Sequence, residues 1–135
     1  MLGKGAPSAH AEPWRPPAPP PKVLYALDAA LTPLSPVADV SQLTAYATAA
    51  VQAGQGNVLD ASHVIFPNGA ITLVLILAES HLSVHTWPEE NLIAVDLFSC
   101  GAIDGPKVIS ELVRLLRLAD RDVRQLARGA QADRG

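Results

Sequence analysis

Cysteine and long apolar runs are both scarce in this chain of 135 residues. The single cysteine, Cys100, rules out a disulfide-stabilised scaffold and fits a reducing compartment. The longest apolar run, Ala70 to Ala78 interrupted only by Thr72, suits a strand but is less than half of the roughly 20 residues that a membrane-spanning helix needs. The N-terminal segment also lacks the apolar core of a signal peptide. We therefore expect a soluble protein of the cytoplasm, with no membrane partner.

Positive charge is missing from most of the chain. No Lys or Arg occurs from Val23 to Pro106, whereas that stretch carries the carboxylates of Asp28, Asp39, Asp60, Glu79, Glu89, Glu90, Asp96 and Asp104. A nucleic-acid groove or a phosphate site needs cationic side chains, or a Gly-rich turn that leads into a helix, and neither is present. The sequence therefore predicts no nucleic-acid partner and favours a small cationic ligand.

Disorder of the whole chain is excluded because 49% of its residues are hydrophobic and its mean hydropathy is +0.21. Proline is concentrated at the N-terminus, where residues 1–21 hold seven of the 12 prolines. Such a segment favours polyproline II over helix or sheet. We expect a disordered Pro-rich tail over 1–21, with a ligand for a proline-binding module as the less favoured interpretation. One domain should follow over 22–128, and a flexible C-terminus over 129–135.

Hydrophobic periodicity predicts six strands and two helices. The strands are expected at 23–27, 57–66, 71–77, between Ser80 and Pro88, at 92–98 and at 121–128. One helix is expected between a cap at Asp39 or Ser41 and Gly54, and a second one from Asp104 and Pro106 through Ala119. The resulting order is β-α-β-β-β-β-α-β. It indicates an α+β fold, a two-layer α/β sandwich with a mainly antiparallel sheet and two helices on one face.

Reactive side chains are concentrated in one stretch, which contains Glu79, Ser80, His81, His85, Glu89, Glu90, Asp96 and Cys100. A zinc site built from His81, His85 and Cys100 is disfavoured, because four residues of strand separate the two imidazoles by about 13 Å. No CxxC or HExxH pattern is present either. We expect no metal.

Hydrolytic sites are weaker alternatives. Ser80 lies in Ala-Glu-Ser-His-Leu, which is not the Gly-flanked elbow of a serine hydrolase. A cysteine hydrolase that pairs Cys100 with His85 stays open, because Cys100 follows a strand and precedes Gly101. Taken alone, each such residue is more often packed than catalytic.

Two sequence blocks carry a specific resemblance. The first is Glu-Ser-His-Leu-Ser-Val-His-Thr-Trp-Pro-Glu at residues 79–89, and the second is Asp-Leu-Phe-Ser-Cys-Gly at residues 96–101. Together, and with their spacing, they strongly resemble the pyruvoyl-dependent S-adenosylmethionine decarboxylases of the short bacterial and archaeal kind. The likeness continues more loosely from about Val23 to Val123.

This resemblance implies a proenzyme that cleaves itself between Glu79 and Ser80. The Ser80 hydroxyl would attack the Glu79 carbonyl, and elimination and hydrolysis would leave a pyruvoyl group in place of Ser80, with the loss of ammonia. Such a group forms a Schiff base with a substrate amine and withdraws electrons from the α-carbon, as pyridoxal phosphate does elsewhere. The implied reaction is decarboxylation of S-adenosylmethionine, which supplies the aminopropyl donor for spermidine biosynthesis.

The resemblance also implies roles for individual residues. His85 matches the acid/base of self-processing, and Cys100 matches the general acid that protonates the carbanion. Thr72 lies where the family carries a Ser or Thr that assists the acyl shift. Phe66 and Glu89 match the aromatic ring and the carboxylate that bind the substrate, which carries a sulfonium and an ammonium. Trp87 is either a further aromatic face or a core residue.

The chain departs from the family pattern at two places. Pro21-Lys22-Val23 leads into the first strand without the usual Gly-x-His, and Leu73 replaces the second Gly of Gly-Val-Ser/Thr-Gly. We expect Leu73 to reshape the substrate pocket. The alternative functions are a pyruvoyl-dependent decarboxylase of another amino acid, such as ornithine or arginine, and a non-catalytic regulatory paralogue. The family forms a homodimer of cleaved protomers with active sites near the interface, so we expect at least a homodimer here.

Overall fold

The computed structural model describes residues 13–17 and 19–129. Its elements in chain order are β1 (Lys22–Ala30), α1 (Val40–Ala53), β2 (Val58–Ile65), β3 (Ile71–Leu77), β4 (Ser80–Trp87), a short 3₁₀ helix (Pro88–Glu90), β5 (Leu92–Cys100), α2 (Gly105–Leu115) and β6 (Ala119–Arg128). The predicted order of elements is therefore confirmed.

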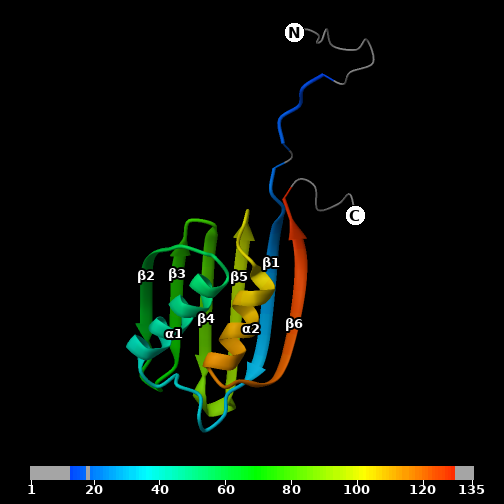
Figure 1. Ribbon diagram of the computed structural model, residues 1–135. Coiled ribbons are helices and arrows are strands. Elements are labelled where there is room, and N and C mark those ends of the chain that lie inside the picture. The colour runs from blue at the N-terminus through cyan, green and yellow to red at the C-terminus, as the bar shows by residue number, and fades with distance from the viewer. Residues whose placement is uncertain (1–12, 18, 130–135) are drawn as a thin grey trace.

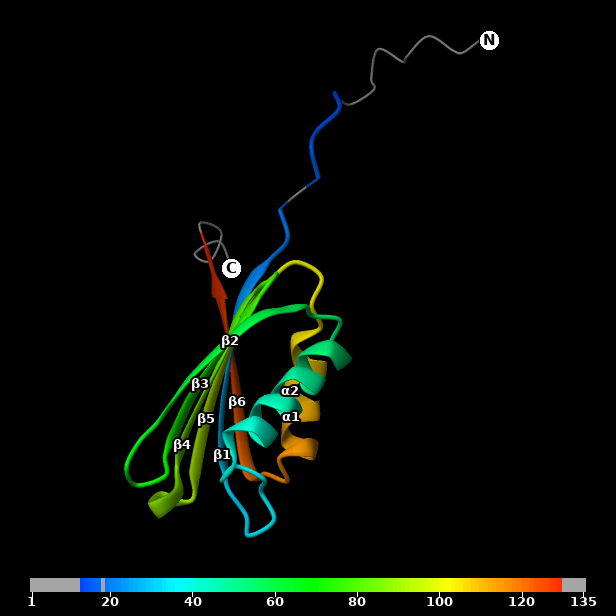
Figure 2. The ribbon, with the colours of Figure 1, turned by 90° about the vertical axis from the view of Figure 1, so that its left-hand side faces the viewer.

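The six strands form one sheet in the order β2-β3-β4-β5-β1-β6, and every neighbouring pair is antiparallel. Figure 1 shows both helices in front of the sheet, and the turned view in Figure 2 shows that they cover the same face. The α+β fold class and the two-layer α/β sandwich are thus confirmed.

Local chemistry explains where the helices begin. The side chain of Asp39 accepts a hydrogen bond from the Ser41 N–H at 2.9 Å and caps α1. The side chain of Asp104 does the same for the Lys107 N–H at 3.1 Å, with Pro106 in the first turn of α2. Of the two caps considered for the first helix, the structure uses Asp39.

The prediction that the second helix continues through Ala119 is wrong. The helix ends at Leu115, and Arg117 has a φ of 52°, which no continuing helix accommodates. Ala119 instead begins β6.

The first strand is longer than predicted, because β1 extends on both sides of residues 23–27 and includes Lys22. Pairing of β1 with β5 and β6 along its length accounts for this extension.

The hydrophobic core fills the space between the helices and one face of the sheet. Along β3, β4 and β5, alternation buries about every second side chain, including Leu73, Leu75, Leu82, Val84, Val95 and Leu97. Leu73 is 0% exposed, faces the helices and does not line the pocket described below, so its effect on the substrate pocket stays a prediction. A position that alternates with Thr72 necessarily points to the other side of the sheet.

The opposite face of the sheet, called here the open face, has no layer over it within the described residues (Figure 2). It presents large apolar side chains to solvent, among them Val64, Ile76 and Leu126, which are 53%, 44% and 56% exposed. A single sheet that leaves such a face uncovered is typical of a surface that binds something. Among the described helices, none is long and apolar enough to cross a membrane.

Residues 13–17 and 19–21 lie outside helices and strands, and their side chains are exposed. Residues 1–12, 18 and 130–135 lie outside the described part of the chain. The disordered tail over 1–21 and the flexible C-terminus over 129–135 therefore stay predictions.

Candidate active site

The predicted site residues form two groups at opposite ends of β4. Ser80 is the first residue of this strand and His85 the sixth, so about 16 Å of strand separates them at roughly 3.3 Å per residue. In Figure 1 the hairpin between β3 and β4 lies at the upper end of the sheet, whereas the turn between β2 and β3 lies at the lower end. We call these regions the hairpin end and the pocket end.

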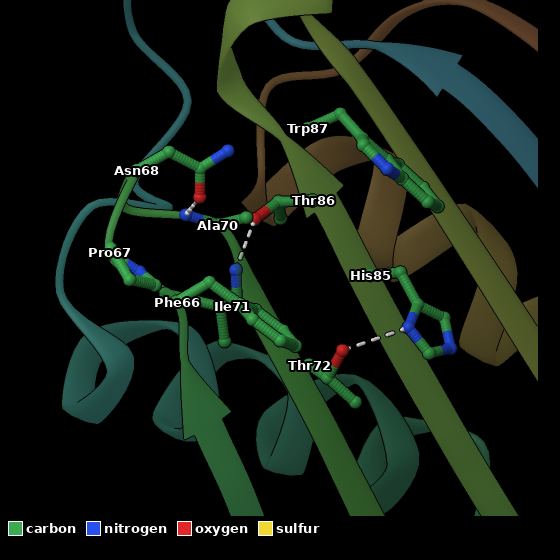
Figure 3. A pocket seen from close by; sticks show the side chains of 9 residues that line it. All are labelled: Phe66, Pro67, Asn68, Ala70, Ile71, Thr72, His85, Thr86 and Trp87. Carbon is green, nitrogen blue, oxygen red and sulfur yellow. Dashed lines mark hydrogen bonds between the residues drawn. The ribbon is translucent and has the colours of Figure 1, made fainter.

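The pocket end contains a direct side-chain pair. Thr72 on β3 lies opposite His85 on β4, and the Thr72 Oγ1 is 3.1 Å from the His85 Nδ1 (Figure 3). Both side chains belong to the open face, because each alternates with buried neighbours along its strand. The register of the two strands thus joins two residues that stand 13 positions apart in the sequence.

Aromatic rings complete a pocket of about 510 Å³ beside this pair. Phe66 and Trp87 contribute to its lining together with Thr72 and His85 (Figure 3). Trp87 is 36% exposed and its ring centroid is 6.1 Å from that of His85, so it belongs to the pocket and not to the core. Such rings offer π faces to a cationic or planar ligand.

Polar groups fix the rim of the pocket. The Asn68 Nδ2 donates to the Glu89 Oε2 at 3.2 Å, and the Asn68 Oδ1 accepts from the Ala70 N–H at 3.0 Å. The Thr86 Oγ1 accepts from the Ile71 N–H at 2.9 Å and ties β4 to the start of β3. No sequence motif indicates that Asn68 reaches the Glu89 carboxylate.

The hairpin end is built on an unusual turn. Leu77 pairs with Ser80, so the loop consists of only Ala78 and Glu79. Two-residue loops normally place Gly, Asn or Asp at positions of positive φ. Here the positive φ falls on Ser80, at 146°, a value that favours glycine and costs another residue of order 1–3 kcal/mol. The unfavourable conformation thus falls on Ser80, the residue that directly follows the Glu79 carbonyl.

Glu79 is held on two sides. Its carboxylate accepts hydrogen bonds from the Asn57 N–H and the Asn57 Nδ2, both at 3.0 Å. Its main-chain oxygen accepts from the Cys100 N–H at 2.9 Å. This last contact polarises the Glu79 carbonyl, and a fixed N–H at that distance stabilises negative charge that develops on the oxygen. Asn57 carried no signal in the sequence.

Cations reach the hairpin end from outside the Lys- and Arg-free stretch. Cys100 pairs with Lys22 on β1, and Lys22 pairs with Arg128 on β6. The guanidinium carbon of Arg128 lies 5.8 Å from the centroid of the Phe98 ring. The stretch that favours a small cationic ligand therefore does not form the hairpin end alone, because β1 and β6 add the positive charges of Lys22 and Arg128.

Other chemistries gain no support from the geometry. His85 pairs with Ala94, six residues before Cys100 on β5, so about 20 Å of strand separates the proposed base and thiol of a cysteine hydrolase. Within residues 13–17 and 19–129, no group of three or more His, Cys, Asp or Glu side chains could hold a metal ion.

Comparisons with known proteins identify the family. A family model described as S-adenosylmethionine decarboxylase matches residues 25–129. The S-adenosylmethionine decarboxylase proenzyme of Picrophilus torridus is 32% identical over 110 residues, which cover 80% of each chain. The S-adenosylmethionine decarboxylase proenzyme 2 of Bacillus anthracis is 38% identical over 74 residues, which cover 54% of this chain and 60% of the relative.

Two further facts qualify these likenesses. The chain spans about three fifths of the length of the Bacillus relatives that it matches. The crystal structure of the adenosylmethionine decarboxylase from Aquifex aeolicus superposes with a TM-score of 0.72, covering 83% of this chain and 93% of that one at 24% identity. At 24% identity, this superposition supports the fold alone.

Proposed function

Because the chain belongs to the S-adenosylmethionine decarboxylase family, we propose that it is a self-processing, pyruvoyl-dependent enzyme that decarboxylates S-adenosylmethionine. The product would serve as the aminopropyl donor for spermidine biosynthesis. The names of the relatives favour this substrate over ornithine or arginine. The observation that carries the proposal is the geometry at the hairpin end, where the strained Ser80 follows a carbonyl that already accepts a hydrogen bond from the Cys100 N–H.

Self-cleavage begins at this carbonyl. The Ser80 Oγ attacks the Glu79 carbonyl carbon, the peptide C–N bond breaks, and an ester replaces the amide. The Cys100 N–H stabilises the oxygen that becomes negative during the attack. Loss of the Ser80 α-proton then expels the Glu79 carboxylate and leaves dehydroalanine, which water converts to a pyruvoyl group and ammonia. Cleavage relieves the unfavourable φ at Ser80, and this relief favours cleavage over re-formation of the peptide bond.

The residues around Ser80 suit a pyruvoyl group. This group would supply an electrophilic carbonyl for the substrate amine and an electron sink for the decarboxylation. The Cys100 side chain lies on the open face, on the strand next to β4, from where its thiol would deliver a proton to the α-carbon.

The pocket end offers groups that suit the substrate. Phe66 and Trp87 offer ring faces to the sulfonium and the adenine, and Glu89 offers a carboxylate at the rim.

Within one chain, the pair of Thr72 and His85 is too far from the Glu79–Ser80 bond to assist its cleavage. About 16 Å of β4 separates His85 from Ser80. A two-fold homodimer removes the difficulty. If two open faces pack against each other with their β4 strands running in opposite directions, the pocket end of one protomer covers the hairpin end of its partner. Each dimer then holds two complete sites.

The exposed side chains of the open face support this arrangement. Val64, Ile76 and Leu126 would be buried between the two sheets, in the manner of a β-sandwich core. Thr72 and His85 of one protomer would then assist the acyl shift and the proton transfer at Ser80 of the other. We place the enzyme in the cytoplasm, where the Cys100 thiol stays reduced.

An intact-mass spectrum of the denatured protein tests the proposal. We expect two fragments, residues 1–79 and 80–135, the second lighter by one ammonia than a fragment that begins with serine. Ser80→Ala should remain a single chain, whereas the matched control Ser83→Ala, on the same strand, should be cut. A wild-type chain that stays uncut after long incubation would contradict the proposed function and favour a non-catalytic regulatory role.

A further inference from the structure

We propose that Arg128, held over the Phe98 ring, binds the α-carboxylate of the amino-acid substrate beside Cys100. This inference rests on the proposed function and deepens it, because it names a substrate-binding residue that no sequence motif indicates. Arg128 lies at the end of β6, outside the two sequence blocks that carry the family resemblance.

The position of the guanidinium supports this role. Arg128 belongs to β6, two strands from β5, yet its guanidinium carbon lies 5.8 Å from the centroid of the Phe98 ring on β5. Its side chain therefore reaches across β1 toward the strand that carries Cys100. Lys22 lies between them in the register, opposite Cys100 on one side and Arg128 on the other. Two cationic residues thus lie on the same side of Cys100 on the open face, one and two strands away from it.

The Phe98 ring forms a platform for the guanidinium. On its other side lies the His81 ring, with centroids 6.0 Å apart, and His81 directly follows Ser80. A guanidinium held by a cation–π contact keeps its N–H groups available for a carboxylate. The cluster of His81, Phe98 and Arg128 is therefore a preformed anion site next to the residue that carries the chemistry.

No carboxylate of the described residues forms an ion pair with Arg128 or Lys22. Arg124, on the same strand and face, differs in this respect, because it pairs with Asp28 at 3.1 Å and with Asp122 at 3.5 Å. The Glu79 side chain is engaged by Asn57 and does not neutralise the cations. Among the residues that the structure describes, the hairpin end thus holds two cations without a carboxylate partner.

The substrate supplies the matching anion in the right place. Its amine has to reach the carbonyl that derives from Ser80, and its carboxylate is attached to the same α-carbon as that amine. Ser80 pairs with Ser99 on β5, between Phe98 and Cys100, so we expect a carboxylate one carbon from the amine to lie over β5. Self-cleavage creates a second carboxylate of the same chemistry, the new C-terminus at Glu79. The experiment has to separate these two sources.

The test compares Arg128→Gln with Arg121→Gln, a control on the same strand but the other face of the sheet. We expect Arg128→Gln to cleave itself fully and to raise the KM for S-adenosylmethionine about 10- to 100-fold, the usual strength of a charge-assisted hydrogen bond, with kcat changed less than about threefold. Inhibition by decarboxylated S-adenosylmethionine and by the methyl ester of S-adenosylmethionine should not change, because neither carries the α-carboxylate. Arg128→Lys should recover part of the affinity.

An equal loss of affinity for the substrate, the product and the ester would overturn the proposal, since it would assign Arg128 to the Glu79 terminus or to the fold. An unchanged KM would overturn it as well. If Arg128→Gln fails to fold, Phe98→Leu replaces it, with a smaller expected rise in KM and the same selectivity for the carboxylate. A wild-type protein that is never cut would instead refute the proposed function, which a mass spectrum reveals before any kinetics.

Discussion

The hairpin end and the pocket end of β4 differ in whether backbone groups or side chains form their main features. At the hairpin end the decisive features belong to the backbone, namely the positive φ of Ser80 and the hydrogen bond from the Cys100 N–H to the Glu79 oxygen. At the pocket end they belong to side chains, namely the pair of Thr72 and His85 and the rings of Phe66 and Trp87. In the proposed function, the first arrangement prepares a bond for cleavage, and the second one binds the substrate and transfers protons.

This difference teaches why the fold leaves one face of its sheet bare. An antiparallel strand can carry reactive groups at both ends, but its length keeps them apart within one protomer. In the proposed homodimer, a second sheet packed on the open face in the opposite direction would join them. In such a dimer, even a small domain could form an enclosed site, because each protomer would supply only half of the residues that surround it.

The largest effect is expected from the loss of the base at the pocket end. His85→Ala should slow self-cleavage by about 100- to 10,000-fold, the usual contribution of a positioned acid/base group. His63→Ala, which removes an exposed imidazole on the edge strand β2, serves as the control and should cleave at the wild-type rate. Cleavage can be followed by intact mass over time. A normal rate for His85→Ala would remove His85 from the processing step.

A smaller effect is expected from the rings of the pocket end, and on a different step. Phe66→Ala should leave self-cleavage intact but raise the KM for S-adenosylmethionine by about 5- to 150-fold, the range set by stacking on an aromatic side chain. Steady-state kinetics on the fully cleaved protein measure it. Equal KM values for the variant and the wild type would show that the 510 Å³ pocket does not bind the substrate.

Next in size is the support of the hairpin end by Asn57. Asn57→Ala removes the side-chain hydrogen bond to the Glu79 carboxylate but keeps the bond from the Asn57 N–H, so we expect cleavage to slow about three- to tenfold. The control is Gln52→Ala, an exposed change on α1. Complete loss of cleavage, or no change at all, would each contradict the view that Asn57 positions the Glu79 peptide.

The smallest effect is expected from a substitution on α2, away from both the hairpin end and the pocket end. The hydrogen bond from Arg114 lowers the pKa of Glu111 on α2, with help from the charges of Arg114 and Lys107. Because the folded-state pKa lies below the unfolded one, this contribution to stability is present at neutral pH and is lost as the pH falls through the folded value. Glu111→Gln should lower the midpoint of urea unfolding slightly at pH 7, and the difference should vanish in acid. Its self-cleavage should match the wild type.

Much of the fold could be predicted because local signals and global structure agree. Asp39 caps a helix whose apolar residues recur at helical spacing, and Ile71–Leu77 has the length and composition of a buried strand. The end of α2 was misjudged because Ala119 continues an apolar pattern past the left-handed Arg117, and no residue type there marks the break.

The candidate site was predictable only in part. The sequence blocks point to Ser80, His85 and Cys100, but they do not reveal that Ser80 and Cys100 lie together at the hairpin end and His85 lies at the pocket end. Pairing between distant strands creates the contacts of Asn57 with Glu79 and of Arg128 with Phe98. Such contacts depend on register, which a single sequence does not reveal.

The central claim, that two protomers share each site, is tested most directly by mixing two inactive chains. Ser80→Ala lacks the bond-forming hydroxyl, and His85→Ala lacks the base, so each variant alone should stay largely uncut. The two variants can be co-expressed with different tags and purified as the mixed dimer. One of its two sites then combines an intact Ser80 with an intact His85.

In that mixed dimer, intact mass should show the His85→Ala chain cut between Glu79 and Ser80 and the Ser80→Ala chain whole. If neither chain is cut, although the mixed dimer is folded and each wild-type dimer cleaves itself, the two ends do not meet across an interface, and the shared-site account is wrong.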